Sequence, residues 1–255
     1  MIKFENTEVV GWEAAIRGMR NPMNSWEKSD SGYGCDEYPQ YTCAHCGAYD
    51  DTYAECPGTQ KYKIGLNDLD LMKRLRNAGT DHRKFMRMIT VYVDITAPLY
   101  WWKEFDTYKV GTVANSCSTM HKIHEKEFTL EDFSCEHLMN ISNDDPCDAL
   151  FLDGTNVRVD GDDLIGLTIN VLNYYRKRYL ETKDKKYWWQ MIQLLPSSYN
   201  QKRTVMLNYE VLANIYKSRK NHKLDEWAKG FIDWIKTLPY YELITGIDPS
   251  KKEGE

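Results

Sequence analysis

The chain has 255 residues and a mass of 30.0 kDa, and 42% of its residues are hydrophobic, 28% charged and 13% aromatic. This composition excludes disordered, collagen-like and membrane-spanning proteins. Its 33 Lys and Arg residues against 38 Asp and Glu residues give a net charge of −5, so no overall positive field is present to bind nucleic acid nonspecifically.

The first residues, Met1 to Asn6, do not contain the apolar stretch of a signal peptide. No later apolar run approaches the ~20 residues of a membrane-spanning helix. We therefore expect a cytoplasmic protein that has no membrane partner. The length predicts one domain or two small ones. Residues 8–12 predict a first strand, and residues 12–20 predict a short helix.

Residues 31–62 are rich in Gly, Tyr, Asp and Cys and follow neither the helix nor the strand period, which indicates an insertion on a loop. Four of the seven cysteines lie here with the spacing C-x7-C-x2-C-x9-C. The central pair resembles a zinc knuckle, and thiolates are preferred zinc ligands. The predicted ligands of a structural zinc ion are Cys35, Cys43, Cys46 and Cys56. A loop with free thiols is an equally open alternative.

The next three segments have clear periods. Residues 67–79 predict a helix with an apolar stripe that ends at Gly79. Residues 86–96 alternate between apolar and polar side chains, which predicts a strand. A short helix is expected to follow over residues 98–105.

The remainder of the chain is expected to be mainly helical. Residues 156–159, which lie between two glycines, predict one arm of a hairpin. Two helices are expected to begin near Asp162 and Asp184, where the aspartates can cap them. Apolar stripes then predict helices over residues 201–218 and 224–238.

Two polar segments carry candidate site residues. Three cations and an imidazole between His82 and Arg87 form a candidate anion or nucleotide site, since Arg matches phosphate geometry; the alternative is a solvated charge run. Small hydroxyl residues between Gly111 and His121 suit the orientation of a polar ligand, or else a loop that caps its own backbone. The motifs GxGxxG, GxxxxGK[ST], GxSxG and HExxH do not occur in the chain, so the dinucleotide, P-loop, hydrolase and zinc-protease classes lose their main support.

The C-terminal part contains a motif with a known counterpart. After Leu195 and Pro196, three polar residues follow in the spacing N-x5-N-x4-R: Asn208, Asn214 and Arg219. This order resembles the flavin-dependent thymidylate synthases, which methylate dUMP with FAD, NADPH and methylenetetrahydrofolate.

The resemblance extends in order over residues 76–240. The segment around His82 is similar to the Gly-His segment of the family near the flavin, and residues 95–100 are similar to the strand-to-helix corner that follows it. The family signature RHRxxSxNExSxRY falls on residues 107–121 with one extra residue, and both Arg of its first trio, its Glu and its later Arg are replaced. The positions that keep the character of the signature are Lys109, Asn115 and Ser118.

The resemblance implies a single domain over residues 1–255 with an α/β fold of the α+β type, in which a central, mostly antiparallel sheet is backed by helices and the C-terminal half is helical. It implies a homotetramer whose active sites form where subunits meet. FAD is the implied cofactor, NADPH and methylenetetrahydrofolate are the implied co-substrates, and a pyrimidine deoxynucleotide is the implied substrate.

In that family the two Asn contact the flavin and the Arg holds the nucleotide. The residues that the resemblance assigns to the cofactor are His82, Lys109, Asn208 and Asn214. Those that it assigns to the substrate are Asn115, Ser116, Ser118 and Arg219, and Arg219 is also the candidate catalytic residue. Further candidates are Arg83, Arg87 and His222. We expect Asn208, Asn214 and Arg219 to project from successive turns of one helix into a shared cavity.

The expected function is therefore that of a thymidylate-synthase-like flavoenzyme acting at C5 of dUMP or a related nucleotide. A changed nucleotide or one-carbon donor, as in viral pyrimidine modification, would explain the altered signature. The first alternative is a catalytically inactive nucleotide-binding or regulatory protein of the same fold, which the replaced Arg and Glu positions favour. The second is a zinc-dependent enzyme, which requires an open coordination position.

Overall fold

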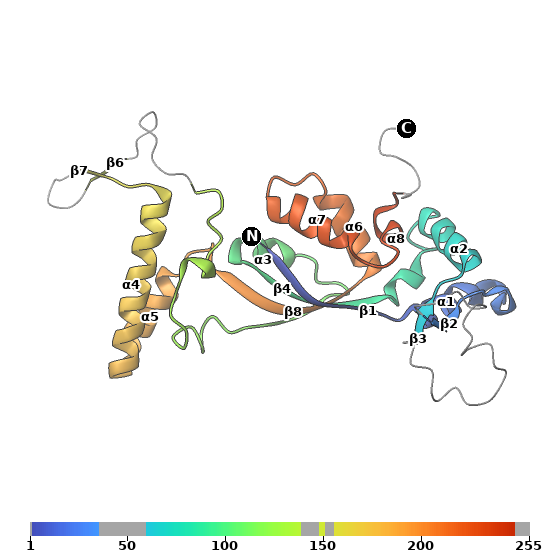
Figure 1. Ribbon diagram of the computed structural model, residues 1–255, viewed down its shortest axis with the longest axis horizontal. Coiled ribbons are helices and arrows are strands. Elements are labelled where there is room, and N and C mark those ends of the chain that lie inside the picture. Colours follow the sequence, from blue (N-terminus) through green and yellow to red (C-terminus); the bar gives the residue numbers. More distant parts are fainter. Residues whose placement is uncertain (1, 36–59, 139–147, 151–155, 248–255) are drawn as a thin grey trace.

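The computed structural model describes residues 2–35, 60–138, 148–150 and 156–247. Its centre is a four-stranded antiparallel sheet in the order β1-β4-β8-β5. The strands are β1 (Lys3–Val10), β4 (Thr90–Pro98), β8 (Asn200–Asn208) and β5 (Val113–Ser116). The helices α6 (Tyr209–Arg219) and α7 (Ile232–Lys236) lie on one side of this sheet (Figure 1).

Alternation along β4 sets the core face of the sheet. Val91, Val93 and Ile95 are 0 to 1% exposed, and they belong to the same buried cluster as Val205 and Leu207 of β8. The predicted alternation is thus confirmed, but the strand begins at Thr90 rather than at residue 86. Residues Lys84–Arg87 instead form a 3₁₀ turn, whose two apolar side chains are both buried.

The prediction of one helix over residues 201–218 is wrong in its first half. Residues 200–208 form β8, in which Val205 and Leu207 lie opposite Val93 and Val91 of β4. Val205 and Leu207 are fully buried while Met206 between them is only partly buried, as the alternation of a strand requires, and the backbone of β4 satisfies the hydrogen bonds of the segment. The helix α6 begins only after Asn208, so the site motif starts at a strand-to-helix corner.

The N-terminal part packs at one end of the sheet. The strand β1 begins earlier than the predicted residues 8–12, and the helix α1 (Trp12–Arg20) has the predicted bounds. Gly11 joins them with φ +94°, and a Cβ there would lie 2.1 Å from a backbone oxygen of β4's entry turn. The other elements of this part are β2 (Gly32–Cys35), β3 (Gln60–Lys63) and α2 (Leu66–Asn77), and α2 closely matches its predicted range.

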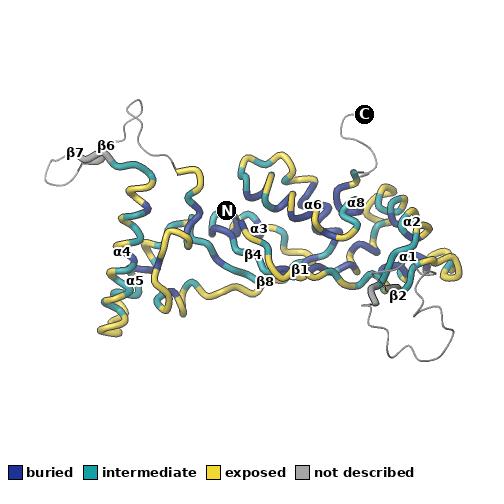
Figure 2. The backbone as a smooth tube through the Cα atoms, in the orientation of Figure 1, coloured by how far each residue is buried: buried dark blue, intermediate teal, exposed yellow. Residues whose placement is uncertain are grey.

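An arm lies at the opposite end of the sheet (Figure 1). It consists of the helices α4 (Gly161–Thr182) and α5 (Lys185–Leu194), which pack on a second hydrophobic cluster. Ile165 and Leu172 are the buried residues of α4, and exposed residues occur along its whole length (Figure 2). Asp184 caps α5 as predicted, whereas α4 is capped by Asp160, which accepts a hydrogen bond from the Asp163 amide, rather than by Asp162.

The remaining elements are short. The strands β6 (Asp148–Leu150) and β7 (Asn156–Arg158) pair as a hairpin, which confirms the predicted hairpin arm. The helix predicted over residues 224–238 begins as a π-helical segment at Glu226–Phe231, continues as α7 and is followed by α8 (Glu242–Thr245). Within the described ranges, none of the helices is both long enough and apolar enough to cross a membrane. The expected α+β architecture, with an antiparallel sheet backed by helices, is confirmed.

Candidate functional site

Asn208 occupies the corner between β8 and α6. Its side-chain Oδ1 accepts a hydrogen bond from the Val211 backbone N–H at 3.0 Å, so Asn208 caps the helix. Its Nδ2 faces Gly111, where φ is +77° and an added Cβ would lie 3.0 Å from that nitrogen. The loop before β5 therefore passes close to Asn208.

At the other end of α6, Arg219 belongs to a group that we call the Arg219 cluster: Glu104, Tyr108, Arg219, His222 and Trp227. Arg219 donates from Nη1 to Glu104 Oε2 at 2.7 Å and from Nε to the Tyr108 hydroxyl at 2.9 Å. Its guanidinium carbon lies 5.0 Å from the ring centroid of Trp227. The Arg219 side chain is 18% exposed, so its charge is held at the surface by a carboxylate and two aromatic rings.

Asn214 belongs to a second group on a different side of α6. Arg83 Nη2 donates to Asn214 Oδ1 at 3.3 Å, and Arg83 Nε lies 2.8 Å from Glu210 Oε2 in an ion pair whose N–H does not point along the contact. Glu210 is 6% exposed, so its charge requires this partner. Arg76, in the last turn of α2, feels the charge of this group: burial lowers the pKa of Arg76, and the positive charge of Arg83 lowers it further.

The expectation that Asn208, Asn214 and Arg219 share one cavity is wrong for the single chain. At 3.6 residues per turn, Asn214 and Arg219 lie about 140° apart around the axis of α6. Asn208 precedes the helix in extended backbone, so the direction of its side chain follows from its contacts. Asn208 and Arg219 accordingly face the segment 104–111, and Asn214 is exposed beside Arg83.

The other predicted nucleotide residues lie on the edge strand β5 and beside it. Asn115 and Ser116 are exposed on β5, opposite Thr204 and Arg203 of β8. Ser118 follows the strand, and its Oγ accepts hydrogen bonds from the backbone N–H groups of Met120 and His121, at 3.2 and 2.9 Å. This residue thus adopts the self-capping alternative for the polar stretch. Lys109 is exposed in the loop before β5.

Residues 82–87 form the turn that leads into β4. His82 and Arg87 are exposed, and Arg83 is held by Glu210 and Asn214 as described above. The turn packs against α6, so His82 lies at the same end of the sheet as Asn214. His222, the last of the candidates, lies 3.4 Å from Glu104 Oε2 within the Arg219 cluster.

Most of the predicted zinc site falls outside the described residues, which is where Cys43, Cys46 and Cys56 lie. Cys35 ends β2, and its backbone is opposite Gln60 of β3. Among the side chains that the structure describes, no group of three His, Cys, Asp or Glu residues has the arrangement of a metal site.

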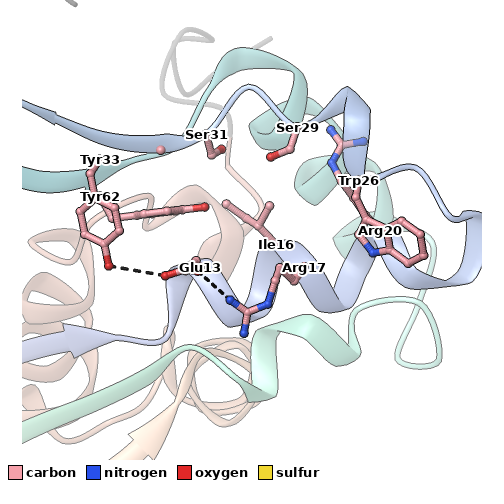
Figure 3. Close-up of a pocket in the computed structure, with 10 residues that line it drawn as sticks. Glu13, Ile16, Arg17, Arg20, Trp26, Ser29, Ser31, Tyr33 and Tyr62 are labelled. Atoms are coloured by element: carbon pink, nitrogen blue, oxygen red, sulfur yellow. Dashed lines mark hydrogen bonds and ion pairs between the residues drawn. The ribbon is translucent and has the colours of Figure 1, made fainter. Parts of the chain in front are cut away.

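A cavity of about 300 Å³ lies between α1 and the paired strands β2 and β3 (Figure 3). Its walls include Trp26 at one end and the ring pair Tyr33 and Tyr62 at the other, with Glu13 and Arg17 along α1. None of the predicted cofactor or substrate residues lines it.

The sequence patterns did not predict three side chains that contact Arg219: Glu104, Tyr108 and Trp227. They are brought to Arg219 from helix α3 (Leu99–Phe105), the turn after it and the π-helical segment. Tyr108 lay within the matched signature, which was the available signal. Glu104 had no local signal, because a carboxylate 115 residues from its Arg cannot be paired with it by spacing. Trp227 fitted the apolar stripe predicted over residues 224–238, which gave no reason to place it beside Arg219.

Comparison with solved structures places this geometry in a known fold. No family profile and no curated protein matches the sequence. Two structures of thymidylate synthase X (ThyX) from Helicobacter pylori, both with FAD and dUMP, match at 15% identity with TM-scores of 0.59 and 0.60, over 96% of this chain and 98% of theirs. The UMP/dUMP methylase PolB from Streptomyces cacaoi, bound with 5-Br UMP, matches at 13% identity and a TM-score of 0.53, over 96% of this chain and 94% of its own. The chain therefore has the fold of the flavin-dependent thymidylate synthases.

Proposed function

We propose that this chain is a flavin-dependent enzyme that acts at C5 of a pyrimidine deoxynucleotide, dUMP or a related nucleotide. The observation that carries the proposal is the fold, shared over 96% of the chain with ThyX structures that contain FAD and dUMP. The retained spacing of Asn208, Asn214 and Arg219 on and beside α6 supports it. NADPH and methylenetetrahydrofolate are the proposed co-substrates by the same resemblance.

The donor set beside α6 fits FAD. Asn214 offers an exposed amide next to the Arg83 guanidinium, and His82, Lys84 and Arg87 present exposed cationic or imidazole groups on the same turn. Amides and imidazoles suit the polar edge of an isoalloxazine ring, and cations suit a diphosphate. Bound FAD supplies hydride-transfer chemistry, while the chain binds and orients the reactants. In the proposal Asn208 and Lys109, on the other side of α6, contact the flavin bound beside Asn214 of a second copy of the chain, and the exposed Lys109 also attracts the nucleotide phosphate.

The nucleotide is assigned to the other side of α6. Asn115, Ser116 and Ser118 offer neutral donors and acceptors along the β5 edge, and Arg219 offers a guanidinium fixed by its cluster. A fixed guanidinium loses little side-chain freedom when it binds, which favours affinity. We assign to Arg219 the role of holding the nucleotide in register with the flavin.

A second copy of the chain is part of the proposal, because Asn214 and Arg219 point to different sides of one helix. A flavin beside Asn214 and a nucleotide beside Arg219 can meet in one site only if the two residues come from different copies. The test mixes two variants, Asn214→Ala and Arg219→Ala, after partial unfolding and refolding together. If each site takes these residues from different copies, a fraction of intact sites returns in the mixture. Recovery no greater than the sum of the separate variants would refute shared sites.

The deciding experiment titrates FAD and then dUMP into the full chain. We expect a bound flavin with absorbance near ~450 nm and dUMP binding that depends on it. Arg219→Lys keeps the charge beside Glu104 but loses the planar fork, and it should weaken dUMP binding by about tenfold or more. Arg178→Ala on the arm is the control, because it removes an Arg that is also paired with a Glu, at 3.2 Å. Colourless protein that does not take up FAD would refute the enzyme proposal.

A nucleotide-binding protein without chemistry is the second candidate. It is favoured by the pairing of Arg83 with Glu210 and of Arg219 with Glu104, which compensates both guanidinium charges. The two candidates differ in one readout. The test measures NADPH oxidation by FAD-loaded protein in the presence of dUMP, with and without methylenetetrahydrofolate. If dUMP binds but NADPH is not oxidised under either condition, the chain is a binding protein.

A further inference from the structure

One carboxylate oxygen in the Arg219 cluster is approached by three nitrogens from three parts of the chain. Glu104 Oε2 accepts hydrogen bonds from Arg219 Nη1 at 2.7 Å and Trp227 Nε1 at 3.0 Å, and His222 Nε2 lies 3.4 Å away. Glu104 is on α3 and its side chain is 35% exposed, so water could satisfy it without these partners. The three contacts therefore hold the Arg219, His222 and Trp227 side chains in place around Glu104, and they are not needed to compensate a buried charge.

The cluster leaves a defined pair of polar atoms for a ligand. His222 Nδ1 accepts a hydrogen bond from the Leu224 N–H at 3.2 Å, which places the imidazole hydrogen on Nε2, facing Glu104. Arg219 Nε is committed to the Tyr108 hydroxyl. Within the described part of the chain, the hydrogen bonds of the cluster use neither Glu104 Oε1 nor Arg219 Nη2. An acceptor and a donor thus lie on adjoining groups.

The charge of the cluster selects the part of a nucleotide that it can take. The carboxylate of Glu104 and the guanidinium of Arg219 carry opposite charges that cancel at short range. A phosphate dianion would gain from Arg219 but be repelled by Glu104. The neutral edge of a pyrimidine base, where an N–H stands beside a carbonyl oxygen, matches an acceptor next to a donor without any such conflict.

We propose that Glu104 is a specificity-determining residue that, together with Arg219, binds the N–H and carbonyl edge of the pyrimidine base, while the phosphate is bound elsewhere. This inference rests on the proposed function, since it assumes that a pyrimidine nucleotide occupies the site. It assigns a substrate contact to a residue outside the matched signature.

The test compares dUMP, dCMP and deoxyuridine, which lacks the phosphate, by calorimetric titration into the FAD-loaded full chain. In Glu104→Gln, the amide oxygen stays with Arg219 and Trp227, so the amide N–H₂ replaces the free acceptor. The variant then presents two donors, which suit the N3 and O2 acceptors of cytosine better than the N3–H of uracil. We expect dUMP and deoxyuridine to weaken by the same factor, about tenfold or more, and the ratio of dUMP to dCMP affinity to fall by about tenfold.

The matched control is Asp106→Asn, two residues further along. Asp106 forms an ion pair with Arg203 at 2.7 Å, the same length as the pair of Glu104 and Arg219. This variant should leave all three affinities unchanged, and thermal unfolding confirms that both variants fold. Glu104→Asp, which keeps the acceptor charge, should restore part of the preference for dUMP.

Each outcome separates the two levels of the argument. A loss confined to dUMP, or a gain in dUMP affinity in Glu104→Gln, places phosphate in the cluster and overturns the role given to Glu104. Affinities in Glu104→Gln equal to those in Asp106→Asn also overturn it. In both cases wild-type binding leaves the proposed function standing. Wild-type protein that binds neither dUMP nor deoxyuridine refutes the proposed function itself, and the inference with it.

Discussion

The buried carboxylate of Asp68 holds the N-terminal part of the fold together. Asp68 has no exposed surface and accepts hydrogen bonds from Arg20 Nε at 2.7 Å, Ser29 Oγ at 2.7 Å and Ser31 Oγ at 2.6 Å. Arg20 is 4% exposed and donates its two other nitrogens to backbone carbonyls. These bonds join α1, α2 and the segment that leads into β2.

Removing the carboxylate should therefore be costly. Asp68→Ala leaves the buried charge of Arg20 uncompensated, for which a loss of about 3–5 kcal/mol in the free energy of unfolding is expected. Asp68→Asn keeps the shape and one acceptor, so about 2 kcal/mol is expected from the weaker bonds. The control is Asp70→Ala on the same helix. Asp70 pairs with Arg74 at 2.9 Å but is 67% exposed, and its loss should cost about 0–0.5 kcal/mol.

Urea unfolding measures these differences, and its pH dependence adds a second check. Burial alone would raise the pKa of Asp68, but hydrogen bonds from Ser29, Ser31 and Arg20 and the charge of Arg20 bring it below its ordinary 3.8. Because the folded pKa is lowered, the stabilisation is complete above the unfolded-state pKa and is lost as the pH falls through the folded value. Asp68→Asn should lack this acid limb. A cost below ~1 kcal/mol for Asp68→Ala, or an acid limb shared with Asp68→Asn, would refute the reasoning.

Two further substitutions test the corner at Asn208 and the arm. Gly111→Ala puts a Cβ at φ +77° and 3.0 Å from both Asn208 Nδ2 and Val211 Cγ2. We expect it to lower the free energy of unfolding by about 1–2 kcal/mol in thermal unfolding and to weaken flavin binding in titration. Unchanged flavin affinity would mean that Asn208 does not contact the cofactor. Leu172→Ala leaves a cavity at a fully buried position in the cluster under α4. It should lower the free energy of unfolding in urea by about 2–5 kcal/mol. A loss near zero would show that the arm does not pack through this cluster.

Local pattern accounts for the elements that the sequence predicts well. In β4 the alternation of Val91, Val93 and Ile95 is itself the property that forms the strand, and it is visible in any window of the sequence. The strand β8 was missed because Val205 and Leu207 fit the apolar stripe of the following helix as well as a strand. Pairing with β4, more than 100 residues away, decides between the two.

The site motif shows the same limit. The spacing of Asn208, Asn214 and Arg219 is readable in the sequence, and so is the capacity of an Asn to cap a helix. The direction in which each side chain points depends on where α6 begins, and a helix drawn from residue 201 hides the capping position of Asn208. The two hydrogen-bond partners of Arg219, Tyr108 and Glu104, lie 111 and 115 residues away in the sequence, so only the fold brings them to it.

The pairing of both guanidinium groups makes a final prediction about charge. The signature arginines of the family are replaced here. Of the remaining candidates, Arg83 and Arg219 are paired with Glu210 and Glu104, whereas Arg87 is exposed. A nucleotide phosphate would then meet mainly exposed cations such as Lys109, whose attraction salt screens, while the neutral contacts to the base are indifferent to salt. We expect dUMP affinity to fall by less than about tenfold between ~50 mM and ~500 mM salt, and Lys109→Gln to remove most of that dependence. A steep salt dependence that survives Lys109→Gln but disappears in Arg219→Gln would mean that Arg219 exchanges Glu104 for the phosphate, and the neutral-edge account of the cluster would then be wrong.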